Sequence, residues 1–210
     1  QKQKAQNAPS DQPAGQFAEP LRQGAYFQQG VVTGEIQQVV ITNVHAGFAG
    51  FGDQLQHLAE RAAREAGEIA LRYWRRDPQV WDKADGAGPV TEADLAVNAH
   101  LERRLRGARP DYGWLSEESP DDPARLAAGH CFVIDPIDGT RAFMAGAPSW
   151  GVLIGLGDAD GPIYGIIDQP HLEARFEGGL GIARMIGRHG TVPLATRRGV
   201  SLTEATLMTE

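Results

Sequence analysis

The sequence predicts an α+β or layered α/β architecture, and two observations support this fold class. Two stretches between Asp53 and Leu105 show apolar residues at helical spacing, and short apolar runs between turn residues follow Pro110. Because helices do not alternate regularly with the later strands, the pattern disfavours a doubly wound sheet. A length of 210 residues is that of one ordinary domain, or of one domain with a tail.

Composition and charge exclude several classes of protein. Twenty Lys and Arg face 27 Asp and Glu, a net charge of −7, so a surface that neutralises nucleic acid or an anionic membrane is not expected. The single cysteine, Cys131, excludes an intramolecular disulfide framework and a zinc site with several cysteines. No apolar run approaches the roughly 18 residues of a membrane span. We therefore expect a cytoplasmic protein.

Residues 1–50 are rich in Gln, Gly, Ala and Pro and show no sustained period of either kind. We expect a flexible leader or an extension outside the folded domain, although the apolar residues at 31–32 and 39–41 are compatible with a strand. The domain itself is expected to cover residues 51–210.

The first helix is predicted to begin at Asp53, which can act as its N-cap with Gln56 three residues later, and to end by Pro78. Its other face carries alternating charges and is expected to be a solvated surface. The buried stripe is predicted to contain Leu55, Leu58, Ala62, Ala66, Ile69 and Tyr73.

The second helix is predicted to begin after a loop over 85–89, with Thr91 as N-cap and Asp94 in the reciprocal position of a capping box. Its buried stripe comprises Val97, Leu101 and Leu105. Asp94 shares that inward face, where an acid needs a partner. It either only completes the capping box or also projects toward a functional site.

The later strands are predicted at Tyr112–Leu115, Cys131–Ile134, Trp150–Leu156, Ile163–Ile167 and Ala174–Phe176. The glycine-dense segment 178–190 is interpreted as turns. Trp150 opens a strand and is expected in the core, with contact to a ring of a bound ligand as the alternative.

The segment 131–141 carries the main functional signal. Four apolar residues form a buried strand, and Asp135 follows at its carboxyl end, where open sheets place their ligands. Asp138 comes three residues later, and Gly139 permits a turn that brings both acids to one volume. Two such carboxylates repel each other unless a cation lies between them, and Mg²⁺ suits an all-oxygen site. The alternative is a turn in which both acids only cap loops.

Further groups are expected to converge there. Thr140 can cap a helix that continues from Arg141 and directs free N–H groups at an anion. Glu117 and Glu118 follow a predicted strand, and at most one of them should enter the pocket if the chain stays extended.

Three ordered motifs resemble those of the inositol monophosphatase family of metal-dependent phosphatases. They are Val-Thr-Glu-Ala-Asp at 90–94, Leu-Ser-Glu-Glu-Ser at 115–119 and Asp-Pro-Ile-Asp-Gly-Thr at 135–140. The resemblance runs from about residue 53 to the end and implies a layered α/β/α/β sandwich.

The resemblance also implies roles for individual residues. It makes Glu117, Asp135, Asp138 and the Ile137 carbonyl ligands of Mg²⁺. It gives Asp94 and Thr140 the activation of the attacking water, and Asp138, Gly139 and Thr140 the binding of phosphate. Lys83 is similar to a family lysine near the metals, or is an ordinary surface lysine.

Within the family, Arg141–Phe143 and Gly165–Pro170 are most similar to histidinol-phosphate phosphatases. This implies hydrolysis of L-histidinol phosphate, with inositol 1-phosphate or adenosine 3′,5′-bisphosphate as alternative substrates. The expected partner is a small phosphorylated metabolite, and a homodimer is expected.

One family motif is absent. The family's later Trp-Asp motif, which supplies another aspartate to the second metal, does not follow Asp138. The resemblance therefore implies that the C-terminal half is missing, through a sequence fragment, a natural truncation or completion by another chain. The alternative function is a noncatalytic metal-binding or dimerising remnant.

Overall fold

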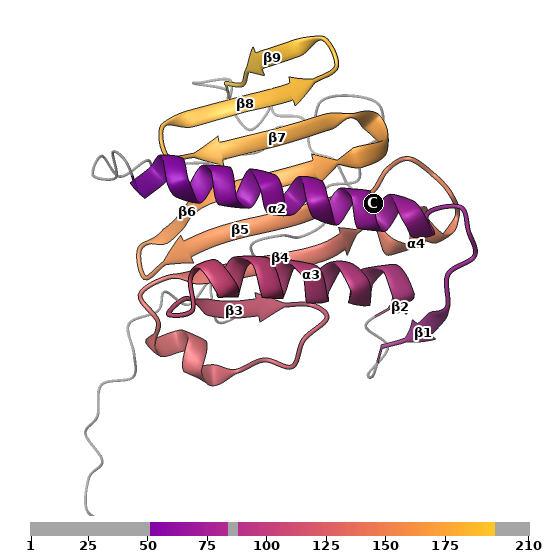
Figure 1. Cartoon of the computed structure of the whole chain (residues 1–210), viewed down its shortest axis with the longest axis horizontal. Coiled ribbons are helices and arrows are strands. Elements are labelled where there is room, and N and C mark those ends of the chain that lie inside the picture. Colours follow the sequence, from indigo (N-terminus) through magenta and orange to yellow (C-terminus); the bar gives the residue numbers. More distant parts are fainter. Residues whose placement is uncertain (1–50, 84–87, 196–210) are drawn as a thin grey trace, which may run out of the picture.

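Two helices lie over one large sheet in the computed structural model, which describes residues 51–83 and 88–195 (Figure 1). Helix α2 covers Phe51–Tyr73 and helix α3 covers Glu92–Ala108. The α+β prediction is confirmed, and the described residues form one helical layer and one sheet layer. The leader expected at residues 1–50 lies outside the described residues.

The sheet has seven strands in the order β3-β4-β5-β6-β7-β8-β9. Strands β3 and β4 run parallel, and every later neighbouring pair is antiparallel. The strands are β3 (Gly113–Ser116), β4 (Cys131–Asp138), β5 (Gly151–Asp158), β6 (Gly161–Gln169), β7 (Ala174–Gly179), β8 (Ile182–Gly187) and β9 (Gly190–Pro193).

Shorter elements complete the fold. A two-stranded hairpin of β1 (Val80–Asp82) and β2 (Pro89–Thr91) lies between the long helices in the chain. The single-turn helix α4 (Thr140–Met144) follows β4. Two 3₁₀ helices, η2 and η3, span Pro123–Ala127 and Pro170–Leu172.

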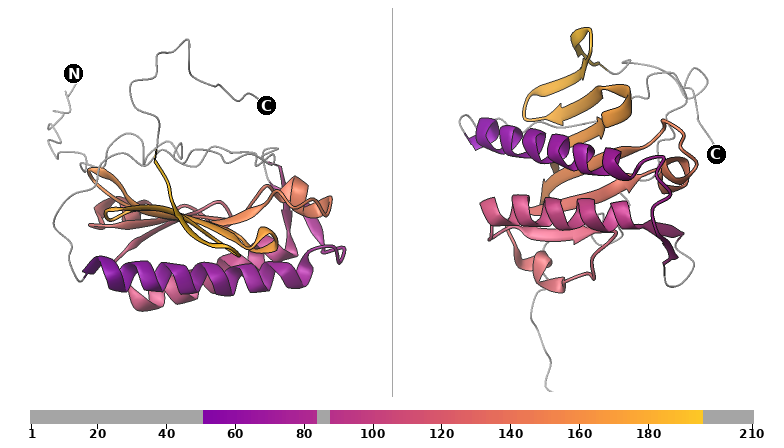
Figure 2. Two further views of the ribbon diagram at one scale, coloured as in Figure 1. Left: turned by 90° about the horizontal axis from the view of Figure 1, so that it is seen from above. Right: turned by 45° about the vertical axis from the view of Figure 1, so that its right-hand side comes forward.

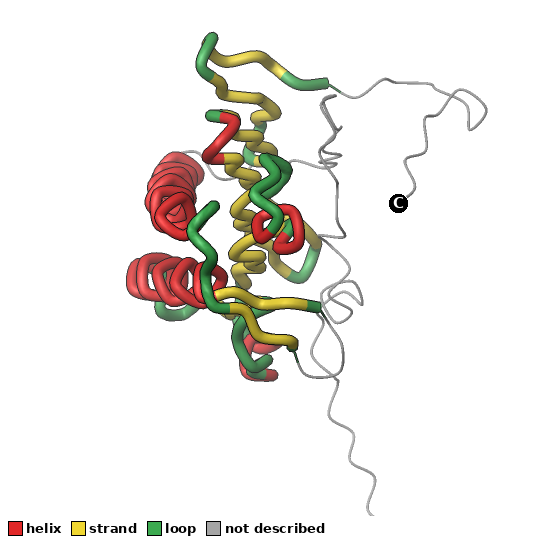
Figure 3. Tube along the Cα trace, turned by 90° about the vertical axis from the view of Figure 1, so that its right-hand side faces the viewer, coloured by secondary structure: helices red, strands yellow, loops and turns green. Residues whose placement is uncertain are grey.

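Both long helices cover the same face of the sheet, as Figures 2 and 3 show from two directions. The core between them is built from the inward stripes of α2 and α3 and from alternate residues of β4, β5 and β6. Alternation along the strands follows from the pleat, which points successive side chains to opposite faces. Neither helix is long and apolar enough to cross a membrane within the described ranges.

Helix α2 differs from the prediction at both ends. It begins at Phe51, so Asp53 lies in the first turn and is not the N-cap. An acid there still interacts favourably with the positive end of the helix dipole. The helix ends at Tyr73, before Pro78, because Arg75 adopts a left-handed conformation with φ 59°. In the predicted buried stripe, Ile69 and Tyr73 are only partly buried.

Helix α3 confirms its predicted cap. Thr91 accepts a hydrogen bond from the Asp94 N–H, and the Thr91 N–H donates to the Asp94 side chain, which completes the capping box. The predicted stripe of Val97, Leu101 and Leu105 is fully buried.

Two segments predicted as loops or turns contain strands. The segment 178–190 contains the end of β7, all of β8 and the first residue of β9, so the interpretation as turns is wrong. Strand β8 pairs with β7, where Arg184 lies opposite Glu177 and donates two hydrogen bonds to it. Glu177 is buried, and Arg184 also donates a hydrogen bond to Glu60 on α2. This cross-strand pair stabilises the pairing of β7 with β8. Part of the predicted 85–89 loop forms β2, and residues 84–87 lie outside the described ranges.

Candidate functional site

The centre of the site is the end of strand β4, next to its partner β5. The register between these strands shifts between Asp135 and Asp138, so the chain bulges where Pro136 cannot donate to the ladder. Asp135 is only 8% exposed, and its carboxylate has no hydrogen-bond partner among the described residues. A buried acid without a partner is costly unless a cation compensates it.

The turn after β4 depends on Gly139, which has φ 82°. A Cβ on this residue would lie 2.7 Å from the backbone oxygen of Ser149, so both the conformation and the space require glycine. Gly139 is the N-cap of α4 and Thr140 is its first helical residue, which corrects the prediction that Thr140 caps the helix. The Thr140 hydroxyl is therefore free for other contacts.

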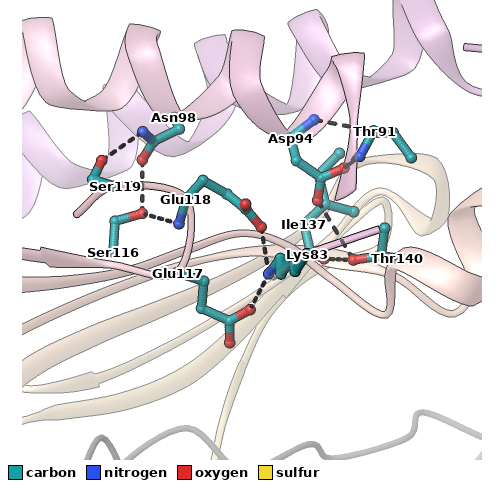
Figure 4. Close-up of polar contacts among 10 residues, drawn as sticks. All are labelled: Lys83, Thr91, Asp94, Asn98, Ser116, Glu117, Glu118, Ser119, Ile137 and Thr140. Atoms are coloured by element: carbon teal, nitrogen blue, oxygen red, sulfur yellow. Dashed lines mark hydrogen bonds and ion pairs between the residues drawn. The ribbon is translucent and has the colours of Figure 1, made fainter. Parts of the chain in front are cut away.

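Those contacts connect α4 to α3. The Thr140 Oγ1 donates to the Ile137 carbonyl oxygen at 3.0 Å and lies 3.4 Å from Asp94 Oδ1 (Figure 4). Asp94 lies 46 residues before Thr140 in the sequence, and the fold brings the two side chains together.

Asp94 is held rigidly from one side. Its Oδ2 accepts hydrogen bonds from the Thr91 N–H at 2.8 Å and from the Thr91 Oγ1 at 2.5 Å. Burial raises the pKa of Asp94, and the bonds from Thr91 oppose this shift. Asp94 therefore does more than complete the capping box, because Oδ2 serves the cap while Oδ1 faces Thr140.

Lys83 lies among the acidic groups and is not an ordinary surface lysine. Its Nζ is 2.7 Å from Glu118 Oε1 and 3.2 Å from Glu117 Oε2. Burial alone would lower the pKa of Lys83, but the hydrogen bonds and charges of Glu118 and Glu117 raise it above its usual value. The ammonium group thus neutralises part of the acidic cluster.

Both glutamates contact this lysine, and only Glu118 is buried, in line with the expectation that at most one would enter the pocket. Residues 117 and 118 form a turn instead of an extended strand, so alternation does not apply to them. The side chain of Glu118 is 6% exposed and that of Glu117 is 55% exposed. Burial raises the pKa of Glu118, and Lys83 opposes the shift.

A small polar network supports this turn and was missed in the sequence. Asn98 on α3 accepts from the Ser116 hydroxyl at 2.7 Å and donates to Ser119 at 2.9 Å. Ser116 in turn accepts from the Glu118 N–H at 3.3 Å. The available signal was a second polar residue one turn after Asp94 on the inward face of α3.

The acids are close enough to influence one another electrostatically. Burial, followed by the charges of Glu117 and Asp138, raises the pKa of Asp135 to about 8. Burial and the charge of Glu117 raise the pKa of Asp138 to about 6, while a hydrogen bond from the Gly139 N–H opposes the shift. A cation between these groups would relieve the repulsion.

The donors fit a hard cation by their chemistry. All are carboxylate or carbonyl oxygens, the ligands that Mg²⁺ prefers. In the described part of the chain no three Asp, Glu, Cys or His side chains are arranged so that they could hold a metal ion together. The Lys83 ammonium occupies the side of the cluster formed by Glu117 and Glu118.

Comparison with known proteins agrees with the fold and the order of the motifs. Residues 52–210 match the sequence profile of the Inositol monophosphatase family. The chain belongs to this family. The membership inferred from the three motifs is therefore confirmed.

Similar proteins are named as phosphatases of different substrates. Histidinol-phosphatase from Chlorobaculum parvum is 39% identical over 116 residues, which are 55% of this chain and 44% of that protein. The 3′-phosphoadenosine 5′-phosphate phosphatase from Mycobacterium leprae is 42% identical over 100 residues, 47% of this chain and 35% of that protein. Each match covers less than half of the relative's length.

A solved structure supports the same fold. The extragenic suppressor protein suhB from Bartonella henselae superimposes with a TM-score of 0.60 at 28% identity. The superposition covers 69% of this chain and 56% of that chain. The chain thus shares its fold with part of a solved structure, and the described residues form two of the four layers that the resemblance implies.

Proposed function

We propose that this protein is a Mg²⁺-dependent phosphomonoester hydrolase. The observation that carries the proposal is Asp135, a buried acid without a hydrogen-bond partner in the described residues, which faces Glu117 and Asp138 beside the Gly139 turn. Such an arrangement is stable when a divalent cation binds. The phosphatase names of the relatives are consistent with this chemistry.

The proposed metal ligands are the carboxylates of Glu117, Asp135 and Asp138 and the carbonyl oxygen of Ile137. The Ile137 oxygen accepts a bond from Thr140 and retains a second lone pair for a cation. When bound, Mg²⁺ offsets negative charge on the phosphate and on the leaving oxygen and makes water more acidic.

Asp94 and Thr140 are the proposed groups that orient the attacking water and accept its proton. Thr91 fixes one oxygen of Asp94, which leaves Oδ1 directed at the Thr140 hydroxyl. A pKa raised by burial makes the carboxylate a better base near neutral pH. The proton can pass to Asp94 directly or through the threonine hydroxyl.

Phosphate is proposed to bind at the turn formed by Asp138, Gly139 and Thr140. The Gly139 N–H already donates to the carboxylate of Asp138, so the turn favours an anion. The free N–H groups at the start of α4 are additional donors.

The proposed substrate is L-histidinol phosphate, which is hydrolysed to L-histidinol and phosphate. The motifs at 141–143 and 165–170 and the histidinol-phosphatase of C. parvum support this choice. Inositol 1-phosphate and adenosine 3′,5′-bisphosphate remain the alternative substrates, and the M. leprae relative favours the second. The proposal includes a cytoplasmic homodimer in which 51–210 form the N-terminal part of the phosphatase domain and 1–50 an extension.

The test is phosphate release by the purified protein from all three esters, with and without Mg²⁺. We expect Mg²⁺-dependent release that is fastest with L-histidinol phosphate. Preference for either alternative ester would reject the substrate assignment. Light scattering on the same sample tests the homodimer.

A noncatalytic metal-binding or dimerising remnant is the second candidate. Saturable Mg²⁺ binding without phosphate release from any of the three esters would establish this alternative.

A further inference from the structure

Exposed apolar side chains gather on the elements that carry the site. In the described ranges six large hydrophobic residues are at least one-third exposed, and four of them lie on β1, α3 and α4. Strand β1 leads to Lys83, α3 carries Asp94 and α4 begins with Thr140. The four residues are Val80, Trp81, Leu95 and Met144.

Trp81 is the largest of these side chains and differs from the other tryptophans. It is 44% exposed, whereas the remaining three, all within the described ranges, are at most 9% exposed. Trp150 is 2% exposed and lies behind the Gly139 turn, so its ring is part of the core and is not available to a ligand. Trp81 is therefore the tryptophan that can stack against a bound molecule.

The strand geometry places Trp81 on the same side of its hairpin as Lys83. The β1–β2 ladder continues beyond the strand ends, because the Lys83 N–H donates to the Gly88 carbonyl oxygen at 2.9 Å. Residues 81 and 83 therefore project to one side of the ribbon, since alternate side chains share a face. Lys83 on that side contacts Glu117 and Glu118.

We propose that Trp81 is a specificity residue that stacks on a planar nitrogen heterocycle in the leaving group of the substrate. This inference rests on the proposed function, because the phosphate turn fixes the other end of the ligand. An indole face attracts flat rings and cations, and an imidazole ring is flat and can carry a positive charge. A polyhydroxylated aliphatic ring such as inositol offers neither a flat face nor a positive charge.

Tryptophan fluorescence tests the stacking directly. The probes are L-histidinol, adenosine and myo-inositol, titrated into the full chain with Mg²⁺ and inorganic phosphate present. We expect saturable quenching by L-histidinol and none by myo-inositol. Quenching by adenosine alone would retain the stacking role and identify a nucleoside as the leaving group. Absence of quenching by both heterocycles would overturn the proposal.

Variants identify the residue responsible. Trp81→Ala should abolish the quenching, and KM for L-histidinol phosphate should rise about tenfold with kcat nearly unchanged, the size expected for one stacked ring. Trp81→Phe should retain most of the affinity. Val192→Ala changes an equally exposed residue on β9 and serves as the matched control. A rise in KM for inositol 1-phosphate equal to that for L-histidinol phosphate would contradict the proposal.

Ester hydrolysis tests the proposed function, and quenching tests the stacking role of Trp81 separately. If no ester is hydrolysed but L-histidinol still quenches Trp81, the stacking site stands and the proposed catalytic function fails. If hydrolysis depends on Mg²⁺ but Trp81→Ala leaves quenching and KM unchanged, the function stands and the stacking role is refuted.

Discussion

Replacing Gly139 by alanine should destabilise the protein and damage the phosphate turn. Two costs apply at this position: φ of 82° is unfavourable for a residue with a Cβ, and the new Cβ would lie 2.7 Å from the Ser149 oxygen. The left-handed conformation alone costs about 1–2 kcal/mol for alanine. Contact with a backbone oxygen cannot be relieved by turning a side chain, so we expect overpacking to add about 1–3 kcal/mol.

Gly181 provides the matched control, since its φ is 83° and no atom lies within 4 Å of the position of its Cβ. Gly181→Ala should therefore cost only the conformational part, about 1–2 kcal/mol. The loss of entropy in the unfolded chain is the same for both substitutions and cancels between them. The difference between the two variants isolates the contact with Ser149.

Urea denaturation of both variants measures the two free energies of unfolding, and calorimetry measures phosphate binding. We expect Gly139→Ala to be less stable than Gly181→Ala by about 1–3 kcal/mol, the overpacking cost. Gly139→Ala alone should lose phosphate affinity. Equal destabilisation, or intact phosphate binding in Gly139→Ala, would refute the reasoning about this turn.

Three further predictions concern charged groups. Asp94→Asn should reduce kcat by about 10²–10⁴-fold, the usual contribution of a general base, while the midpoint of urea unfolding barely changes; normal turnover would remove Asp94 from the proposed mechanism. Folding raises the pKa of Asp135 from 3.8 to about 8, so the native state holds this proton more tightly than the unfolded chain does. Without metal, the free energy of unfolding should therefore fall as pH rises between these two values. Asp135→Asn should flatten that slope, and an unchanged pH profile would contradict the burial of this acid. Arg184→Ala should lower the free energy of unfolding by about 3 kcal/mol, because Glu177 would remain buried without this partner. The control Arg188→Ala removes an exposed pair with Glu173 and should lower it by less than about 1 kcal/mol in the same denaturation assay.

Local signals made much of the fold predictable. The capping box of Thr91 and Asp94 and the stripe of apolar residues behind it lie within a few helical turns, so the sequence contains all the information that α3 needs. Strand β8 was not predictable in the same way. Its stability depends on the pairing of Arg184 with Glu177 on a neighbouring strand, and glycine-rich turns hide the alternation.

In the candidate site, too, some contacts follow from local sequence and others depend on distant segments. Asp135 and Asp138 lie in the second half of β4 and Gly139 follows it directly, so their proximity follows from one local segment. The contact of Lys83 with Glu118 joins a hairpin to the end of a distant strand, and no local pattern specifies it. The position of Thr140 in α4 also required coordinates. The left-handed Gly139 is the N-cap, so the helix starts one residue earlier than predicted.

Anomalous scattering from crystals grown with Mn²⁺, a substitute for Mg²⁺ that prefers the same oxygen ligands, is the most direct test of the metal site. We predict a peak in contact with the carboxylates of Glu117, Asp135 and Asp138 at the end of β4. The absence of a peak there at saturating Mn²⁺, with the three carboxylates directed away from one another, would contradict the account.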